Sequence, residues 1–189
     1  MTAPDQQHPD TNATGLVGET ADGGFIALGL AQPLVDALSA LGYEEPTPIQ
    51  REAIPPLLAG SDLLGQAATG TGKTAAFALP MLQQVADGAR AWGDGDRDGR
   101  PIHGFVLVPT RELAIQVSEA MHKYGRKAFG VNVVPVYGGQ DIRQQLRALR
   151  RGADVIVATP GRALDLIRRG ALDLSAVKSV VLDEADEML

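Results

Sequence analysis

The feature that most constrains the fold is a series of short apolar runs separated by amphipathic stretches. The clearest runs are FVLVP, VIVA and SVVLD, which are apolar almost throughout rather than at every second residue. Strands with this pattern are typical of a parallel sheet that is covered on both faces. Because strands and helices alternate, we predict an α/β fold with an open, mostly parallel sheet and helices on both faces. The predicted strands span residues 62–66, 104–109, 132–137, 154–158 and 178–183.

Apolar residues recur at helical spacing in stretches before and between these strands. In the first stretch, Pro33 suits the opening turn of a helix and Gly42 suits its end. A second stretch over residues 48–58 is interrupted by Pro55 and Pro56, so we expect that helix to be short or bent. The apolar stripes are Leu34, Val35, Leu38 and Leu41, then Leu113, Val117, Met121 and Tyr124, and finally Ile142, Leu146 and Leu149.

Composition excludes several classes of protein. The chain has 189 residues, no cysteine and a formal net charge of -6. It therefore has no disulfide framework, no thiolate zinc site and no overall basic field that would indicate nucleic acid, although a local basic rim can still bind it. No secretory signal and no run long enough to span a bilayer is present, so we expect a cytoplasmic protein without a membrane partner.

Two segments lack the periodicity of a packed element. Residues 1–22 are acidic and polar, which predicts a disordered tail ahead of a single domain over residues 23–189. Residues 87–101 are rich in glycine and charge, which predicts an exposed loop.

The segment AATGTGKT has the composition of a phosphate-binding loop. It follows a predicted strand and precedes a helical stretch, which is the placement that such a loop needs. Gly70 and Gly72 permit backbone angles that let successive N–H groups point at phosphate oxygens. Lys73 would place its charge on the β- and γ-phosphates, and the Thr74 hydroxyl could bind Mg²⁺. The strict pattern has glycine where Ala67 stands, and the alternative is a glycine-rich turn followed by a surface lysine.

A second candidate is the acidic cluster in VVLDEAD, at the end of the last predicted strand. Asp183 could hold Mg²⁺ through water, and Glu184 could orient the water that attacks the γ-phosphate. Taken alone, such a cluster is more often a solvated turn or a helix N-terminus. Together with the phosphate loop it predicts a nucleotide-hydrolysis site. Its catalytic residues would be Lys73, Asp183 and Glu184, and its metal ligands Thr74 and Asp183.

These two segments and four others resemble the DEAD-box ATP-dependent RNA helicases. GYEEPTPIQ, residues 42–50, is similar to the family's Q motif, and PTRELA to its motif Ia. The glycine pair after the third predicted strand matches the family's glycine doublet, and TPGR its motif Ib. The resemblance covers residues 25–189 in the same order. It implies an amino-terminal RecA-like domain of the P-loop NTPase class, with ATP and Mg²⁺ as cofactors and RNA as a partner.

The resemblance implies an ATP site in which Phe25 stacks on adenine while Thr47 and Gln50 hydrogen-bond its edge. A site built in this way rejects guanine, because its polar groups would be left unpaired. Without the resemblance, Phe25 would be a core anchor and Gln50 a surface helix residue. The implied ATP-binding residues are Phe25, Thr47, Gln50, Ala67, Ala68, Thr69, Gly70, Thr71, Gly72, Lys73 and Thr74.

An RNA site is implied at the carboxyl ends of the other strands. Small residues there would let a sugar–phosphate backbone approach, and N–H groups and arginines would meet phosphates without reading base sequence. Taken singly, these residues are turn glycines and solvated arginines. We interpret Arg143, Arg147, Arg150 and Arg151 mainly as a solvated helix face. The implied RNA-binding residues are Pro109, Thr110, Arg111, Gly138, Gly139, Thr159, Pro160, Gly161 and Arg162.

The resemblance also implies parts that lie beyond this sequence. The family continues with a Ser-Ala-Thr strand, inserted between the phosphate-loop strand and the strand ending at Asp183, and with a second RecA-like domain that carries arginine fingers. We therefore expect this chain, which stops after the DEAD motif, to have little or no ATPase and no helicase activity by itself. We also expect marginal stability and a tendency to associate, because neighbouring strands would lack a partner.

Two other functions compete with this interpretation. One is a non-catalytic RNA- or protein-binding module that keeps the motifs without hydrolysing ATP. The other is an unrelated phosphate-loop kinase or transporter ATPase, in which the Gln50 motif and TPGR would have no reason to occur.

Overall fold

The computed structural model describes residues 24–68, 70–90 and 100–188, without the side chains of residues 89 and 90. The predicted tail over residues 1–22 lies outside the described residues. So does most of the predicted loop over residues 87–101, but residues 87–90 form the last turn of a helix rather than a loop.

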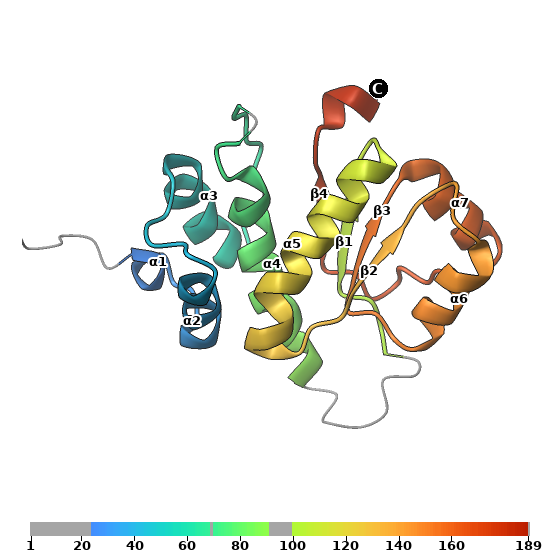
Figure 1. The fold of residues 1–189 in the computed structure, drawn as a ribbon, viewed down its shortest axis with the longest axis horizontal. Helices are drawn as coiled ribbons and strands as arrows, with labels where there is room; N and C mark the ends of the chain where they lie inside the picture. The colour runs from blue at the N-terminus through green and yellow to red at the C-terminus, as the bar shows by residue number, and fades with distance from the viewer. Residues whose placement is uncertain (1–23, 69, 91–99, 189) are drawn as a thin grey trace, which may run out of the picture.

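Four short parallel strands form the central sheet (Figure 1). Their order is β2-β3-β1-β4, and Phe105 of β1 lies between Ile156 and Val180 in register. Each strand falls inside one of the predicted ranges, so the α/β class and the open parallel sheet are confirmed. The strands are β1 (Gly104–Leu107), β2 (Val133–Val136), β3 (Val155–Ala158) and β4 (Ser179–Leu182).

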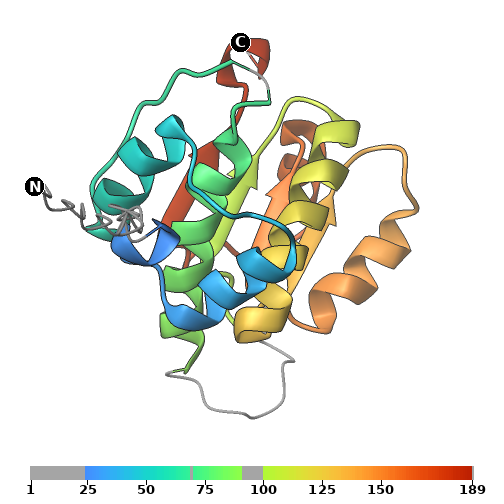
Figure 2. The ribbon, with the colours of Figure 1, turned by 60° about the vertical axis from the view of Figure 1, so that its left-hand side comes forward.

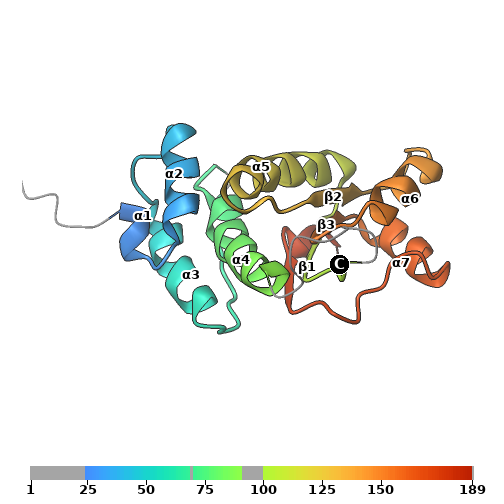
Figure 3. The same ribbon diagram turned by 90° about the horizontal axis from the view of Figure 1, so that it is seen from below.

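The sheet has a hydrophobic core on each face. Val155 and Val157 of β3 join a core with α4 and α5, whereas Ile156 and Ala158 join a core with α6 and α7. Burial on both faces explains why VIVA is apolar throughout. Figure 3 shows the two pairs of helices on opposite sides of the strands. The helices are α4 (Lys73–Arg90), α5 (Arg111–Phe129), α6 (Ile142–Arg150) and α7 (Pro160–Arg168).

The predicted apolar stripes of α5 and α6 both face these cores. The structure adds three elements that we did not predict, which are α1 (Gly24–Ala27), α7, and the 3-10 helix η1 (Ala185–Met188). No helix of the described part of the chain is both long and apolar enough to cross a membrane.

A third layer of helices packs outside α4 and α5 (Figure 1). It contains α1, α2 (Gln32–Ala40) and α3 (Pro48–Leu58). As predicted, α2 has Pro33 in its first turn and is followed by Gly42, with a φ of 83°. Pro55 and Pro56 leave α3 short, at 11 residues, but they do not interrupt it. Both lie near the carboxyl end of α3, so the helix loses two N–H donors while its first turns stay intact.

The strand predicted over residues 62–66 is wrong. This segment has no regular structure between α3 and α4, and Figure 2 shows it as an extended trace leading to the phosphate loop. Leu63 is 44% exposed and Leu64 fully exposed. A strand persists only when a neighbour pairs its backbone groups, and no strand of the described residues pairs with this segment.

Burial on both faces is also wrong for β4. Val181 packs against the core under α4 and α5, but Val180 and Leu182 are 60% and 57% exposed. Strand β4 pairs with β1 alone, so it forms one edge of the sheet. On the face of Val180 and Leu182, the core ends at β1 with Phe105 and Leu107.

Candidate functional site

The phosphate loop and the candidate segments that follow strands meet at one edge of the sheet. Because the strands are parallel, their carboxyl ends lie at the same edge, which is where open α/β sheets bind ligands. The predicted RNA segments follow β1, β2 and β3, and the acidic cluster follows β4. Helix α4 begins at this edge, which lies at the top of Figure 1. The fold therefore brings together segments that are far apart in the sequence.

The phosphate loop has the backbone that glycine permits. Gly70 and Gly72 have φ angles of 82° and 93°, in the left-handed region that other residues rarely adopt. The Thr71 hydroxyl donates to the Ala68 carbonyl at 2.7 Å, which closes the turn. The Gly72 carbonyl accepts from the Ala76 N–H at 3.1 Å, so the loop continues directly into α4.

Lys73 and Thr74 occupy the first turn of α4 and are both half-buried. The first N–H groups of a helix have no partner within it and carry a partial positive charge, which suits a phosphate. Ala67 and Ala68 begin the loop without a strand behind them, and Thr69 lies outside the described residues.

The acidic cluster lies within electrostatic range of the phosphate loop. The Asp183 N–H donates to the Leu107 carbonyl at 3.0 Å, which extends the pairing of β4 with β1. Burial raises the pKa of the Asp183 carboxyl, the positive charge of Lys73 opposes the rise, and the Glu184 carboxylate adds to it. Asp183 thus lies close enough to Lys73 for their charges to interact, as a shared site would require.

Glu184 occupies a strained turn between β4 and η1. Its φ is 51°, and it is the only non-glycine residue of the described ranges with a positive φ. The left-handed conformation costs an L-residue about 1–2 kcal/mol. Strain of this kind is concentrated at functional sites. The turn is therefore a sign, independent of the motif, that this position serves more than the fold.

The donor set suits a metal that is shared with a nucleotide. No group of three or more His, Asp or Glu side chains in the described residues could hold a metal ion by itself. The oxygens predicted to bind the metal are those of Thr74 and Asp183, which both lie at this edge of the sheet. Mg²⁺ is usually bound by one or two protein oxygens, with phosphate oxygens and water completing its shell. The residues present therefore fit Mg²⁺ that arrives with a nucleotide.

Gln50 connects the Q-motif segment to the phosphate loop. It is 1% exposed, so the alternative of a surface helix residue is wrong. Its Oε1 accepts from the Thr47 N–H at 2.9 Å, and its Nε2 donates to the Gly72 carbonyl at 3.1 Å. The Thr47 hydroxyl is buried and faces the Gln50 backbone N–H in a capping box, but its oxygen makes no hydrogen bond of full geometry in the described structure. Buried polar groups are rarely left unpaired, so the Thr47 hydroxyl is available to a ligand.

Phe25, in α1, is 3% exposed and belongs to the core that the third layer of helices shares with α4 and α5. It occupies the place expected of a core anchor, which was the alternative interpretation of this residue. Its ring would have to become uncovered before it could stack on adenine.

The first two predicted RNA segments follow β1 and β2. Pro109 is half-buried, and the Thr110 side chain caps α5 by accepting from the Leu113 N–H at 3.2 Å. Arg111 is the exposed first residue of α5. After β2, the glycine doublet Gly138–Gly139 is exposed, and Gly139 has a φ of 81°.

The third predicted RNA segment joins β3 to α7. The Thr159 N–H donates to the Val136 carbonyl at 2.9 Å, which ties the segment to β2. Pro160 opens α7, Gly161 is exposed, and no side chain caps the helix N-terminus. Its first N–H groups are thus directed at the same edge of the sheet as those of α5.

Side chains outside the motifs hold these segments together. The Arg111 guanidinium lies 5.4 Å from the centre of the Tyr137 ring, which is a cation–π contact. Gln145 donates from Nε2 to the Tyr137 carbonyl and to the Gln140 side-chain oxygen, both at 2.8 Å. Arg162 donates from Nη1 to Gln145 Oε1 at 3.0 Å and to the Gln140 carbonyl at 3.3 Å.

Sequence reasoning missed Gln145, which is 2% exposed. A signal was present, since Gln145 is a polar residue at a position of the apolar stripe formed by Ile142, Leu146 and Leu149. The arginines of the same segment are all exposed, as expected of a solvated face. These are Arg143, Arg147, Arg150 and Arg151.

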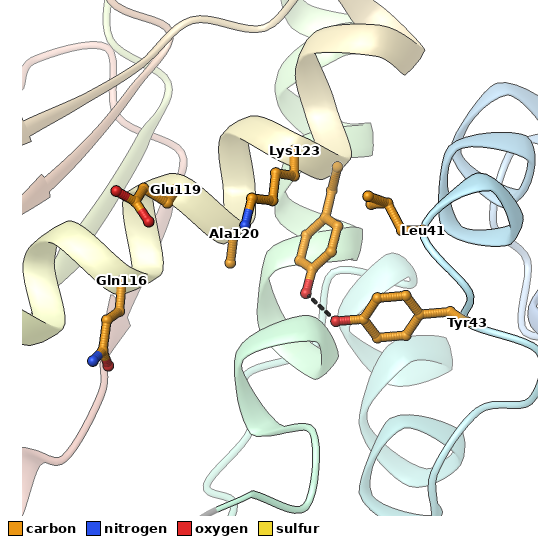
Figure 4. A pocket seen from close by; sticks show the side chains of 7 residues that line it. Leu41, Tyr43, Gln116, Glu119, Ala120 and Lys123 are labelled. Carbon is orange, nitrogen blue, oxygen red and sulfur yellow. Dashed lines mark hydrogen bonds between the residues drawn. The ribbon is translucent and has the colours of Figure 1, made fainter.

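A groove of about 340 Å³ lies apart from this site, between α5 and the segment that follows α2 (Figure 4). The Tyr43 and Tyr124 hydroxyls are hydrogen-bonded there at 2.8 Å, with the rings edge to face. No predicted site residue lines the groove. Its lining residues are Leu41, Tyr43, Gln116, Glu119, Ala120, Lys123 and Tyr124.

Comparisons with known proteins point to one family. Residues 47–189 match the family described as DEAD/DEAH box helicase. Over 165 residues, or 87% of its length, the chain is 54% identical to the ATP-dependent RNA helicase DeaD of Klebsiella pneumoniae. It is 51% identical over the same length to the DEAD-box ATP-dependent RNA helicase CshA of Bacillus cereus. The chain spans 24% and 29% of these two relatives, or about a quarter of their length.

Solved structures agree with this match. The chain is similar to the RNA-helicase Prp28 from Chaetomium thermophilum bound to ADP, with a TM-score of 0.77 and 41% identity over 88% of this chain and 39% of that one. A hypothetical ATP-dependent RNA helicase from Sulfolobus tokodaii gives a TM-score of 0.73 and 36% identity, over 84% and 43% of the two chains. The RecA-like fold that the sequence predicted is thus confirmed.

Proposed function

Because this chain belongs to the DEAD/DEAH box helicase family, we propose that it is the ATP- and RNA-binding lobe of an ATP-dependent RNA helicase. The observation that carries the proposal is that α4 begins with the phosphate loop at the same edge of the sheet at which Asp183 and Glu184 follow β4 (Figure 1). The lowering effect of the Lys73 charge on the pKa of Asp183 supports it.

The phosphate end of the site follows from the chemistry of its residues. Loop N–H groups and the Lys73 ammonium would bind the β- and γ-phosphates, and Thr74 and Asp183 would hold Mg²⁺. Mg²⁺, when bound, neutralises charge that develops on the phosphates. The Glu184 carboxylate, held in its strained turn, would orient the attacking water.

The base end of the site would use the Q-motif segment. The buried Thr47 hydroxyl has an unused hydrogen-bonding capacity that the edge of adenine could fill. Gln50 is bonded to Gly72 on one side and to Thr47 on the other. Its Nε2 has a second N–H and its Oε1 a second lone pair, which could bind adenine while both bonds stay in place. Adenine bound at Gln50 would therefore be linked through this side chain to the phosphate loop.

RNA would bind at the carboxyl ends of β1, β3 and β2, beside the nucleotide. The N-termini of α5 and α7 and the exposed glycine doublet offer N–H groups to phosphates, and Arg111 offers charge. Such contacts do not read bases, so we expect binding that is independent of RNA sequence. Strand separation would require the second RecA-like domain that the resemblance implies.

Hydrolysis in a polypeptide that joins this chain to a second RecA-like domain tests the proposal. We expect RNA to stimulate ATP hydrolysis and Lys73→Ala to abolish it. Glu184→Gln should retain binding of a fluorescent ATP analogue but stop turnover, since it changes water activation and not phosphate contacts. This chain alone should bind the analogue with little or no hydrolysis.

Two results would overturn the proposal. One is hydrolysis that RNA does not stimulate, which would favour a different phosphate-loop ATPase. The other is binding of RNA without any hydrolysis in the two-domain polypeptide, which would favour a non-catalytic binding module.

A further inference from the structure

We propose that Gln145 is a positioning residue for the RNA backbone, because it ties the glycine-doublet loop to Arg162. The inference rests on the proposed function, in that it assumes RNA binding at the carboxyl edge of the sheet. Gln145 lies in none of the motifs that carry the family resemblance.

The Gln145 amide is held in one orientation. The side chain is 2% exposed, and its Nε2 donates both to the Tyr137 carbonyl and to Gln140 Oε1 at 2.8 Å. Its Oε1 accepts from Arg162 Nη1 at 3.0 Å. A primary amide has two N–H donors, and both are used here. A buried amide that is bonded in this way stays rigid, because any rotation leaves polar groups unpaired.

Gln145 bonds the two residues that flank the glycine doublet. Tyr137 precedes Gly138 and Gln140 follows Gly139, so one side chain fixes both ends of the loop. The glycines have no side chains to hold them, and free glycine backbone loses more entropy on ordering than any other residue. A loop fixed at its ends presents its N–H groups with little further loss of entropy.

Arg162 extends the same connection to the third RNA segment. Its guanidinium donates to Gln145 Oε1 and to the Gln140 carbonyl. The segment after β3 is thereby bonded to the loop after β2 through Gln145.

The first RNA segment joins from the other side of the loop. Arg111 lies over the Tyr137 ring, and a Cβ on Gly139 would be 3.3 Å from Arg111 Nη1. Three segments that follow different strands thus meet around one loop, and Gln145 is the buried side chain that bonds to both ends of it.

This arrangement predicts an effect on RNA and not on nucleotide. Each contact to the RNA backbone is weak, so tight binding requires that the protein groups that make these contacts are positioned before RNA arrives. Removing the Gln145 bonds should loosen the loop and raise the RNA concentration needed for half-maximal stimulation. The phosphate loop and β4 are not bonded to Gln145, so hydrolysis at saturating RNA should be preserved.

The test compares Gln145→Leu with Gln144→Leu in the two-domain polypeptide. Gln144 is the exposed neighbour on α6, so the control changes the same residue type on the same helix. Its Oε1 accepts from Gln140 Nε2 at 3.4 Å, a long bond open to water, so the control also measures how much a weak contact to the loop contributes. For Gln145→Leu we expect half-saturating RNA to rise about tenfold, as loss of the hydrogen bonds to the loop would give. The kcat at saturating RNA and the KM for ATP should stay within about twofold, and Gln144→Leu should match the wild type on all three.

Gln145→Glu keeps the test valid if Gln145→Leu does not fold. It preserves the volume and the acceptor for Arg162 but loses both donors to Tyr137 and Gln140. Because both bonds to the loop are lost and an oxygen then faces two acceptors, we expect half-saturating RNA to rise at least as much as in Gln145→Leu, about tenfold or more. Hydrogen exchange of residues 137–140 should accelerate in both variants and not in Gln144→Leu.

The outcomes separate this inference from the proposed function. Unchanged half-saturating RNA in the folded variants, with normal stimulation of the wild type, overturns the inference alone. A fall in kcat together with a rise in the KM for ATP also overturns it, since that pattern indicates a general structural role. No stimulation of the wild type by RNA overturns the proposed function and the inference together.

Discussion

Gly72→Ala should destabilise the chain much more than Gly70→Ala, although the two glycines lie in the same loop. Their φ angles are 93° and 82°, so alanine is strained by about 1–2 kcal/mol at either position. At Gly70 a Cβ would meet no atom within 4 Å. The cost of Gly70→Ala is therefore the backbone strain alone.

At Gly72 the added methyl group would collide with the Gln50 amide. It would overlap Gln50 Nε2 and lie 3.0 Å from the Thr47 hydroxyl. Gln50 is 1% exposed and bonded on both sides, so its side chain cannot move into solvent. Overpacking of this kind costs about 1–3 kcal/mol, and the displaced hydrogen bond about 1 kcal/mol. With the strain included, we expect Gly72→Ala to cost about 3–6 kcal/mol.

Thermal unfolding of the chain, followed by circular dichroism, measures the difference. For a chain of this size 1 kcal/mol corresponds to about 2–4 °C, so Gly72→Ala should unfold roughly 4–16 °C below Gly70→Ala. Gln50→Ala removes the colliding amide and loses the same hydrogen bond, so the double variant should cost about 2–4 kcal/mol less than the sum of the single ones. Equal midpoints for the two glycine variants, or additive costs in the cycle, would refute the contact between the Q-motif segment and the phosphate loop.

Three further predictions concern other parts of the molecule. Burial lowers the pKa of His103 below its ordinary value of 6.5, so the unfolded chain binds the proton more readily than the folded chain. Stability that is present above about pH 6.5 should therefore be lost as the pH falls below it. His103→Phe should make the thermal unfolding midpoint depend less on pH between about pH 7 and 5. Tyr43→Phe removes one hydrogen bond to Tyr124 and should cost about 1 kcal/mol in urea unfolding, and no change would mean that water replaces that bond. Val180→Lys with Leu182→Lys should reduce concentration-dependent association in sedimentation velocity, because both side chains lie exposed on the edge strand.

Elements with a strong local pattern could be predicted from the sequence. VIVA is buried on both faces because β3 has a neighbour on each side and a core on each face. The stripe of α5 leads to buried Val117 and Met121, because a helix of 19 residues has enough turns to define its inner face. In both cases the residues that decide the structure lie within the element itself.

Elements that depend on a distant partner could not be predicted in this way. DLLGQ has the same local pattern as the strands that form, yet residues 62–66 are irregular, because pairing is a property of two segments and not of one. Val180 and Leu182 are exposed for a similar reason, since β4 pairs only with β1 among the described strands.

Gln144 and Gln145 show how far sequence reasoning reaches at the site. They are identical and adjacent, but Gln145 lies three residues after Ile142 and four before Leu149, so helical phase alone places it on the inner face of α6. Its burial could have been inferred, because a polar residue within an apolar stripe must find partners. Its hydrogen-bond partners could not have been inferred from the sequence, since Arg162 comes from the next helix and the Tyr137 carbonyl from the loop before α6. The hydrogen bonds of Gln145 depend on how α6, α7 and the loop before α6 are placed relative to one another. That placement exists only once the sheet has formed.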